Sequence, residues 1–164
     1  MVVNKNKMNF IETEIYDLIP HRPPMLLINK IVSLTQNSSE SIVIINEKTP
    51  FYQNDYLQDK ADDKIAGVPS WIGLEYMGQT AALIAGYQLR EGLTQPHLGF
   101  LLGCRNYTAM ESVFKNNSEL LVSCEQGALV GDSLATFNCH IYDRKSKHEL
   151  ANASLSVFRK PITN

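Results

Sequence analysis

The sequence lacks the composition typical of nucleic-acid-binding and membrane proteins. It carries 15 lysines and arginines against 17 aspartates and glutamates, a formal net charge of −2. Nucleic-acid-binding domains usually show a strong basic excess, so no nucleic acid is expected as a partner. The opening MVVNKNKMNF has no apolar segment of the kind found in signal peptides, and no uncharged apolar run is long enough to span a membrane. We therefore expect a cytoplasmic protein with no membrane span.

Cysteine and histidine are also sparse, which argues against disulfides and metal sites. Cys104, Cys124 and Cys139 are odd in number and show no C-x-x-C spacing, so buried, reduced thiols are predicted. The four histidines are scattered along the chain without metal-ligand spacing. Neither a metal nor a cofactor is expected.

The sequence does contain one long apolar stretch, IAGVPSWIGLEYMGQTAALIAGYQLR, over residues 65–90. Its residues are apolar or small on nearly every face, which predicts a central core helix. Pro69 suits the first turn of a helix, where its missing N–H would have no intrahelical partner, so the helix is expected to open near Val68. Glycine costs roughly 1 kcal/mol relative to alanine inside a helix, so Gly73, Gly78 and Gly86 predict close approach of another backbone.

Two polar side chains, Glu75 and Gln79, interrupt this apolar helix. They lie one turn apart and therefore share a face. Carboxylates are almost never fully buried unless they are paired, so an acid here indicates a functional group. The alternative is that Glu75 points to solvent through a gap in the fold.

The flanking segments predict an α+β fold in a single domain over residues 1–164. Apolar residues recur at helical spacing within an N-terminal helical segment over residues 1–19. Residues 49–64 contain turn formers and charges without a sustained period, so a long irregular loop is expected there. Six strands are predicted, over residues 25–34, 40–47, 97–108, 118–130, 132–143 and 148–158.

The order of these elements predicts how they pack. A single apolar helix needs apolar contact on most sides, and an antiparallel sheet of about six strands supplies that contact by curling around it. Such a sheet keeps open edges, and pairing one edge with a second copy hides it. A dimer is therefore expected.

Two stretches, PHRPPMLLINKIV over residues 20–32 and VPSWIGLEYMGQTAA over residues 68–82, resemble motifs of a known family. The first is similar to the P-H-R-x-P-x-L-L segment of the hotdog-fold 3-hydroxyacyl-(acyl carrier protein) dehydratases, with Asn29 in place of the family's aspartate. The second is similar to their P-G-x-L-x-x-[ED]-x-x-x-Q helix start, with Glu75 and Gln79 in register. The resemblance runs from about Pro20 to Phe158 and is strongest to the dehydratase-like proteins of aryl polyene clusters.

The resemblance implies a fold and a reaction. The fold is a hotdog, a curled sheet around one long helix. The reaction removes water from a 3-hydroxyacyl thioester on an acyl carrier protein, using an acid on the helix and a histidine in the preceding loop, in a tunnel at a dimer interface. Glu75 matches the acid, Gln79 matches the glutamine that orients it, and Pro69 matches the proline at the helix start. Ser70 stands in place of the glycine whose N–H polarises the thioester carbonyl.

The loop histidine of the family is missing, because no residue from Thr49 to Val68 is a histidine. Depending on the alignment, Asp55 or Ala61 stands near its position. Loss of a general acid or base removes on the order of 10² to 10⁴ in rate. We therefore hypothesise that a paralogous subunit supplies the histidine across a dimer interface. His21 is a fallback base, although its place between prolines favours a structural hydrogen-bonding role.

Two other functions remain open at this point. Hotdog thioesterases use an acid on the same helix to activate water, so Glu75, with Asp55 nearby, also fits an acyl-thioester hydrolase. The third interpretation is a noncatalytic subunit that binds an acyl chain.

All three functions require an apolar tunnel and access for the acyl group. Met25, Leu26, Trp71 and Phe100 are the expected tunnel walls, although each also suits a plain core position. An acyl carrier protein is acidic, and a basic rim would attract it. The candidates for that rim are Arg105, Lys115, Arg159 and Lys160.

Overall fold

The computed structural model describes residues 12–58, 61–131 and 133–162. The elements in chain order are α1 (Glu12–Leu18), β1 (Lys30–Leu34), β2 (Ser38–Ile45), β3 (Gln53–Gln58), β4 (Ala61–Pro69), the 3-10 turn η1 (Ser70–Ile72), α2 (Gly73–Arg90), β5 (His97–Ala109), β6 (Val113–Lys115), β7 (Ser118–Val130), β8 (Leu134–Asp143) and β9 (Glu149–Pro161). Residues 1–11 of the predicted N-terminal helical segment lie outside the described residues, and α1 matches its remainder.

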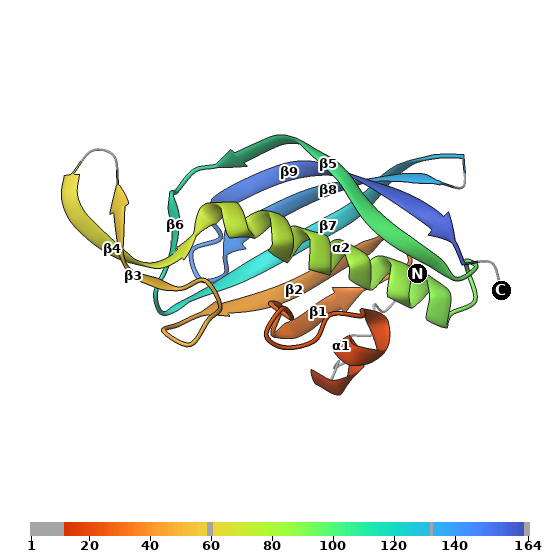
Figure 1. Cartoon of the computed structure of the whole chain (residues 1–164), viewed down its shortest axis with the longest axis horizontal. Coiled ribbons are helices and arrows are strands. Elements are labelled where there is room, and N and C mark those ends of the chain that lie inside the picture. Colours follow the sequence, from red (N-terminus) through yellow and green to blue (C-terminus); the bar gives the residue numbers. More distant parts are fainter. Residues whose placement is uncertain (1–11, 59–60, 132, 163–164) are drawn as a thin grey trace, which may run out of the picture.

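Six of the strands form one antiparallel sheet in the order β1-β2-β7-β8-β9-β5. Figure 1 shows this sheet curling along α2, with β5 passing over the helix from the far end of the sheet. The predicted α+β fold, a curled antiparallel sheet around one long helix, is confirmed. Among the described helices, none is both long and apolar enough to cross a membrane.

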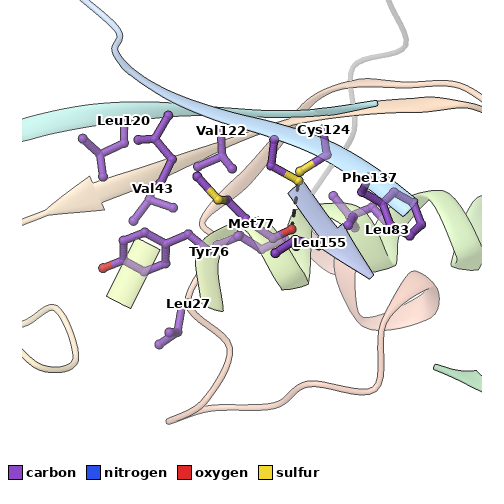
Figure 2. Packing of buried hydrophobic residues seen from close by; sticks show 14 of the residues in the cluster. Leu27, Val43, Tyr76, Met77, Leu83, Leu120, Val122, Cys124, Phe137 and Leu155 are labelled. Atoms are coloured by element: carbon purple, nitrogen blue, oxygen red, sulfur yellow. Dashed lines mark hydrogen bonds between the residues drawn. The ribbon is translucent and has the colours of Figure 1, made fainter. Parts of the chain in front are cut away.

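The core lies between one face of α2 and the concave face of the sheet. Tyr76, Met77 and Leu83 of α2 are fully buried, and Val122 of β7 and Leu155 of β9 are equally inaccessible. Figure 2 shows these side chains packed together. Burial of each large apolar side chain contributes about 1.5–3 kcal/mol, so this contact fixes the position of α2 on the sheet.

A buried hydrogen-bond cluster adds a polar attachment between β2 and α2. The Ser39 hydroxyl donates to the Thr80 carbonyl at 2.6 Å, and the Ser41 and Thr80 hydroxyl oxygens lie 2.7 Å apart. The Thr80 hydroxyl in turn donates to the Tyr76 carbonyl at 2.7 Å. Because buried polar groups are costly when unpaired, these bonds favour one register of the helix against the sheet.

The central helix starts later than predicted. Val68 and Pro69 belong to β4, where they pair with Phe114 and Val113 of β6. Pro69 has ψ 133°, an extended conformation, and the helical turns begin only after it. The physical reason is that a proline disfavours α geometry in the preceding residue, which keeps Val68 extended.

The predicted irregular loop over residues 49–64 is also wrong. It contains β3 and the start of β4, which form a hairpin and join β6 in a three-stranded sheet. Figure 1 shows the hairpin projecting beyond the N-terminal end of α2, away from the core. A hairpin with no core face needs no apolar alternation, so its sequence carried no strand period.

The other strand predictions differ from the structure mainly at their ends. The first strand is shorter than predicted, beginning at Lys30, and the three-residue β6 was not predicted. The five remaining predicted strands correspond to β2, β5, β7, β8 and β9. Long strands with one apolar face are the ones that alternation identifies best.

The cysteines lie in three strands and are all free. Cys124 of β7 and Cys139 of β8 face each other in register and are buried, while Cys104 of β5 is partly exposed. Burial raises the pKa of the Cys124 thiol well above its usual range. The predicted burial is confirmed for Cys124 and Cys139 and is wrong for Cys104, and the reduced state stays a prediction.

Candidate active site

Glu75 lies in the first turn of α2. Its side chain is 44% exposed in this chain. The same side chain lines one end of a groove that runs along α2. The acid is therefore not enclosed as a core position would require, but it opens onto a channel.

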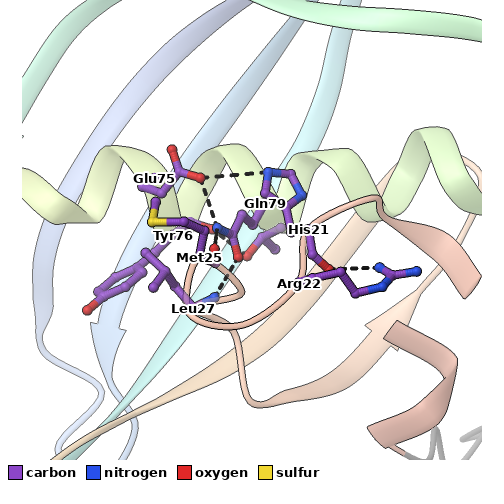
Figure 3. Close-up of polar contacts among 8 residues, drawn as sticks. His21, Arg22, Met25, Leu27, Glu75, Tyr76 and Gln79 are labelled. Carbon is purple, nitrogen blue, oxygen red and sulfur yellow. Dashed lines mark hydrogen bonds and ion pairs between the residues drawn. The ribbon is translucent and has the colours of Figure 1, made fainter. Parts of the chain in front are cut away.

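Gln79 holds the Glu75 carboxylate in place. Its Nε2 donates to Glu75 Oε1 at 2.8 Å and to the Met25 carbonyl at 2.7 Å, and its Oε1 accepts from the Leu27 N–H at 2.9 Å. Gln79 is fully buried, and these partners leave only one sensible orientation of the amide. Figure 3 shows the amide lying between Glu75 and the backbone of residues 25–27. The family's orienting role for this glutamine matches the contacts it makes.

His21 lies beside the same carboxylate, which the sequence alone did not favour. Its Nε2 is 3.8 Å from Glu75 Oε1. Its Nδ1 is buried and, among the described residues, has no hydrogen-bond partner. The ring therefore does not make the backbone contacts expected of a purely structural histidine, and it faces the acid instead (Figure 3).

Arg22 fixes the turn that carries His21, a role that sequence reasoning missed. Its guanidinium donates to the carbonyls of Ile19 at 2.9 Å, His21 at 2.8 Å and Tyr16 at 3.0 Å. It also lies over the Tyr16 ring, 4.8 Å from the centroid. The arginine thus ties α1 to the segment that places His21 near Glu75. The P-H-R motif carried the signal, because the donor immediately follows the histidine.

Ser70 is buried at the start of η1, and its backbone is already engaged. Its N–H donates to the Ser112 carbonyl at 2.9 Å, and its carbonyl accepts from the Tyr107 hydroxyl. Burial, with a smaller contribution from Cys104, raises the pKa of Tyr107 to about 12, so the phenol stays a donor at neutral pH. In this conformation the Ser70 N–H is not free to polarise a thioester, and that role stays a prediction.

The groove beside Glu75 has a volume of about 460 Å³, within the usual range for ligand sites. One wall is a row of small residues on α2, and the facing wall comes from β5, β8 and β9. The small residues are Gly78, Ala81, Ala82, Ala85 and Gly86, and the facing apolar residues include Leu98, Leu101, Ala135, Phe137 and Val157. The sequence analysis did not predict this groove, although small residues at i, i+3, i+4 and i+7 from Gly78 could have indicated it.

Two glycines in this row of small residues have different surroundings. A Cβ on Gly86 would lie 2.0 Å from the Leu18 carbonyl oxygen, so this glycine admits the backbone of α1. A Cβ on Gly78 would meet nothing within 4 Å. Close backbone approach therefore explains Gly86, whereas Gly78 leaves space in the groove.

The expected tunnel walls lie outside this groove. Trp71 is 58% exposed, Phe100 48% and Met25 47%, and Leu26 packs against the core. None of the four lines the groove next to Glu75. Their contribution to a tunnel stays a prediction for an assembly in which another subunit covers them.

Asp55 and the predicted basic rim are not gathered at the site. Asp55 is exposed on β3 and does not line the groove, and its Oδ2 lies 3.8 Å from Lys64 Nζ. Lys115 lies on β6, near the N-terminal end of α2, whereas Arg159 lies on β9 and lines the opposite end of the groove. The four basic residues therefore do not form one continuous rim.

Comparison with known proteins agrees with this fold. The structure is similar to a chain of the dehydratase heterocomplex ApeI:P from Xenorhabdus doucetiae, with a TM-score of 0.74 and 21% identity over 94% of this chain and 93% of that chain. It is also similar to a hypothetical thioesterase from Streptococcus pneumoniae with coenzyme A, with a TM-score of 0.56 and 9% identity over 82% and 88% of the two chains. The PaaI protein of Escherichia coli is similar at a TM-score of 0.56 and 11% identity, over 79% and 81%. No curated protein sequence matches this chain.

A match to a protein family identifies the family of this chain. The ApeP-like family, described as ApeP dehydratase, matches residues 13–164. This match confirms the resemblance to dehydratase-like subunits of aryl polyene synthesis that the motifs around His21 and Glu75 indicated. Because it spans nearly the whole chain, the protein belongs to the ApeP-like dehydratase family.

Proposed function

We propose that the protein dehydrates 3-hydroxyacyl thioesters on an acyl carrier protein, with Glu75 as a catalytic residue. The observation that carries this proposal is the Glu75–Gln79 pair at the end of an apolar groove. In the reaction, a base removes a proton from C2, the C3–O bond breaks, and the leaving hydroxyl takes a proton to become water. Glu75 supplies that proton, and the products are an enoyl thioester and water.

The base that takes the C2 proton is proposed to come from a paralogous hotdog subunit. Residues 49–68, which precede the helix, contain no histidine. Within the described residues, β5 pairs with β9 alone, so its other edge is available to a partner. Leu98, Leu101 and Leu102 on this strand are each more than half exposed, which suits an interface. The similar ApeI:P structure is itself a dehydratase heterocomplex.

His21 is the internal alternative for this base, because its Nε2 already lies 3.8 Å from Glu75 Oε1. A His21→Asn variant separates the two sources of the proton acceptor. If the partner supplies the base, the heteromer keeps most of its rate when His21 is replaced. If His21 is the base, the rate falls by about 10²-fold or more.

Thioester hydrolysis is the second candidate function, favoured by the 44% exposure of Glu75, which leaves room for a water molecule beside it. Product analysis distinguishes the two reactions. The protein is incubated with a 3-hydroxyacyl carrier protein, alone and with its paralogous partner. We expect enoyl thioester from the mixture and little from the single chain. Free acid and free carrier thiol would instead indicate hydrolysis, and equal dehydration without the partner would contradict the heteromer.

A noncatalytic acyl-binding subunit is distinguished by the same assay with Glu75→Gln. An unchanged rate in the heteromer would indicate that this chain only holds the acyl group. Glu91→Gln provides the matched control, because Glu91 follows the same helix and is exposed, and its carboxylate pairs only with the neighbouring Arg90 among the described residues.

A further inference from the structure

The two ends of the groove differ in chemistry. Beyond Glu75 and His21 its lining is apolar until the C-terminal end of α2, where the polar residues Gln88, His97, Gln126 and Arg159 line it. From Glu75 to Gln88 the groove follows α2 for about 20 Å, at a rise of 1.5 Å per residue. There it opens into a second, polar hollow that shares Gln88, His97 and Arg159 with it. An apolar chain that starts at Glu75 therefore ends among hydrogen-bonding groups.

Arg159 is the charged group at this end, and its neighbours hold it in position. Its Nε donates to His97 Nε2 at 3.1 Å, and its Nη2 donates to the Thr94 hydroxyl at 2.6 Å. Since His97 Nε2 accepts, the ring proton belongs on Nδ1, which lies 3.0 Å from the Gln95 carbonyl.

The guanidinium keeps spare donors in this arrangement. Within residues 12–58, 61–131 and 133–162, Nη1 of Arg159 makes no hydrogen bond and no carboxylate lies within 4.0 Å of the guanidinium. The Arg159 guanidinium is held by hydrogen bonds, is partly buried and has no carboxylate partner among the described residues. Such a guanidinium is suited to donate a hydrogen bond to an oxygen atom of a ligand.

We infer that Arg159 determines specificity for the far end of the acyl chain, selecting chains that carry an oxygen there over chains that end in a methyl group. The inference rests on the proposed function, because the thioester must sit at Glu75 for the far end to reach Arg159. His97 and Thr94 position the guanidinium, and its Nη1 donates to the oxygen of the ligand.

The alternative occupant of the groove is the prosthetic arm of the carrier protein, whose phosphate would also suit Arg159. That arm carries two amides. The middle of the groove is lined by Gly78, Ala81, Ala82 and Leu101, whose side chains offer no hydrogen bonds. Burying amides without partners is unfavourable, so a hydrocarbon chain fits this stretch better.

Binding of two matched probes tests the inference. The probes are 3-hydroxyacyl pantetheine amides of equal chain length, long enough to cross the groove, that end in a hydroxyl or in a methyl group. Their affinities are measured by calorimetry for the full chain with its partner subunit. We expect the wild type to prefer the hydroxyl probe by about tenfold or more, as for a hydrogen bond to a charged donor. Arg159→Met should remove this preference, and Thr94→Val should reduce it.

Lys160→Met is the matched control, because Lys160 is the exposed neighbour of Arg159 on β9 and losing it removes the same charge. It should keep the preference. A wild type without preference, or an Arg159→Met variant that retains it, would overturn the inference. An equal loss for both probes in Arg159→Met would assign Arg159 to the carrier arm instead, which also overturns it. If the preference is present but no enoyl product forms on the corresponding thioesters, the proposed dehydration fails and the specificity stands.

Discussion

The side-chain amide of Gln79 connects Glu75 to the backbone of Leu27, which lies 52 residues before Gln79 in the chain. Its Nε2 donates to Glu75 Oε1 at 2.8 Å while its Oε1 accepts from the Leu27 N–H at 2.9 Å. The amide cannot rotate without breaking both bonds. One carboxylate oxygen is thereby fixed, and Oε2 makes no hydrogen bond within the described part of the chain. The carboxyl is held at the groove with one oxygen unengaged, as a group that acts on a substrate requires.

Replacing Gln79 by leucine should disturb the acid more than the fold. Glu75 loses its tether, and a displacement of about 1 Å at a reacting group costs on the order of 10²-fold in rate. The Met25 carbonyl and the Leu27 N–H also lose a buried partner, which lowers the free energy of unfolding by about 1–3 kcal/mol for each group. Steady-state kinetics of the heteromer should show the loss mainly in kcat.

Thr80→Val is the control for that experiment. Thr80 is also fully buried, and its hydroxyl bonds Ser41 and the Tyr76 carbonyl rather than Glu75. It should destabilise the chain to a similar extent while kcat stays close to the wild-type value. A Gln79→Leu variant with wild-type kcat would show that the amide has no orienting role.

Alanine at two glycines of the same helix should change stability in opposite directions. Gly78→Ala meets open space and removes the glycine penalty, so the free energy of unfolding should rise by up to about 1 kcal/mol. Gly86→Ala brings a methyl group within 2.0 Å of the Leu18 carbonyl oxygen and should lower it. Chemical denaturation measures both effects, and two changes of the same sign would contradict the packing of α1 on α2.

The groove itself is tested with a larger side chain at the same position. Gly78→Leu should fold, because its neighbourhood is open, and should fill the groove one turn from Glu75. Turnover of long acyl chains should then fall more than turnover of short ones. Equal turnover of long chains in Gly78→Leu and the wild type would show that the chain runs elsewhere.

Tyr107 should make stability depend on alkaline pH. Burial, with a smaller contribution from Cys104, raises the pKa of Tyr107 from 10.0 to about 12, so the folded chain favours the neutral phenol. The stability that this group contributes is complete below pH 10, where the unfolded chain still holds the proton, and is lost as pH rises through 12.

Tyr107→Phe isolates most of that contribution, because alkaline titrations other than those of its neighbours Tyr76 and Cys104 are common to both proteins. The difference in unfolding free energy between the wild type and the variant should be constant up to about pH 10 and then fall. Urea denaturation over this pH range measures it. A difference that grows above pH 10 would mean that the folded chain ionises the phenol first.

The cysteines should differ in reactivity. Burial raises the pKa of both Cys104 and Cys124, and only the thiolate reacts with alkylating agents. We expect iodoacetamide to modify Cys104 slowly at pH 8, and to modify Cys124 and Cys139 only on unfolding. Peptide mass spectrometry before and after denaturation reads this order, and early labelling of Cys124 would contradict the packing of β7 against β8.

The acid and its orienting glutamine were predictable from sequence because two polar residues one turn apart stood in an apolar helix. The long strands were predictable because one face of each is core. His21 was undervalued because its distance from Glu75 depends on a turn that Arg22 holds through backbone carbonyls, which leave no trace in side-chain periodicity. The polar end of the groove was likewise hidden, since His97 and Arg159 come together only after β9 pairs with β5.

The rate of enoyl thioester formation by the heteromer, assembled with either wild-type chain or Glu75→Gln, tests the central claim most directly. The substitution keeps the size and the Gln79 contact of the side chain but removes the proton that Glu75 donates. We predict a fall of about 10²- to 10⁴-fold in kcat for Glu75→Gln and no comparable fall for Glu91→Gln. Enoyl product forming at the wild-type rate with Glu75→Gln would contradict the assignment of Glu75 as a catalytic residue.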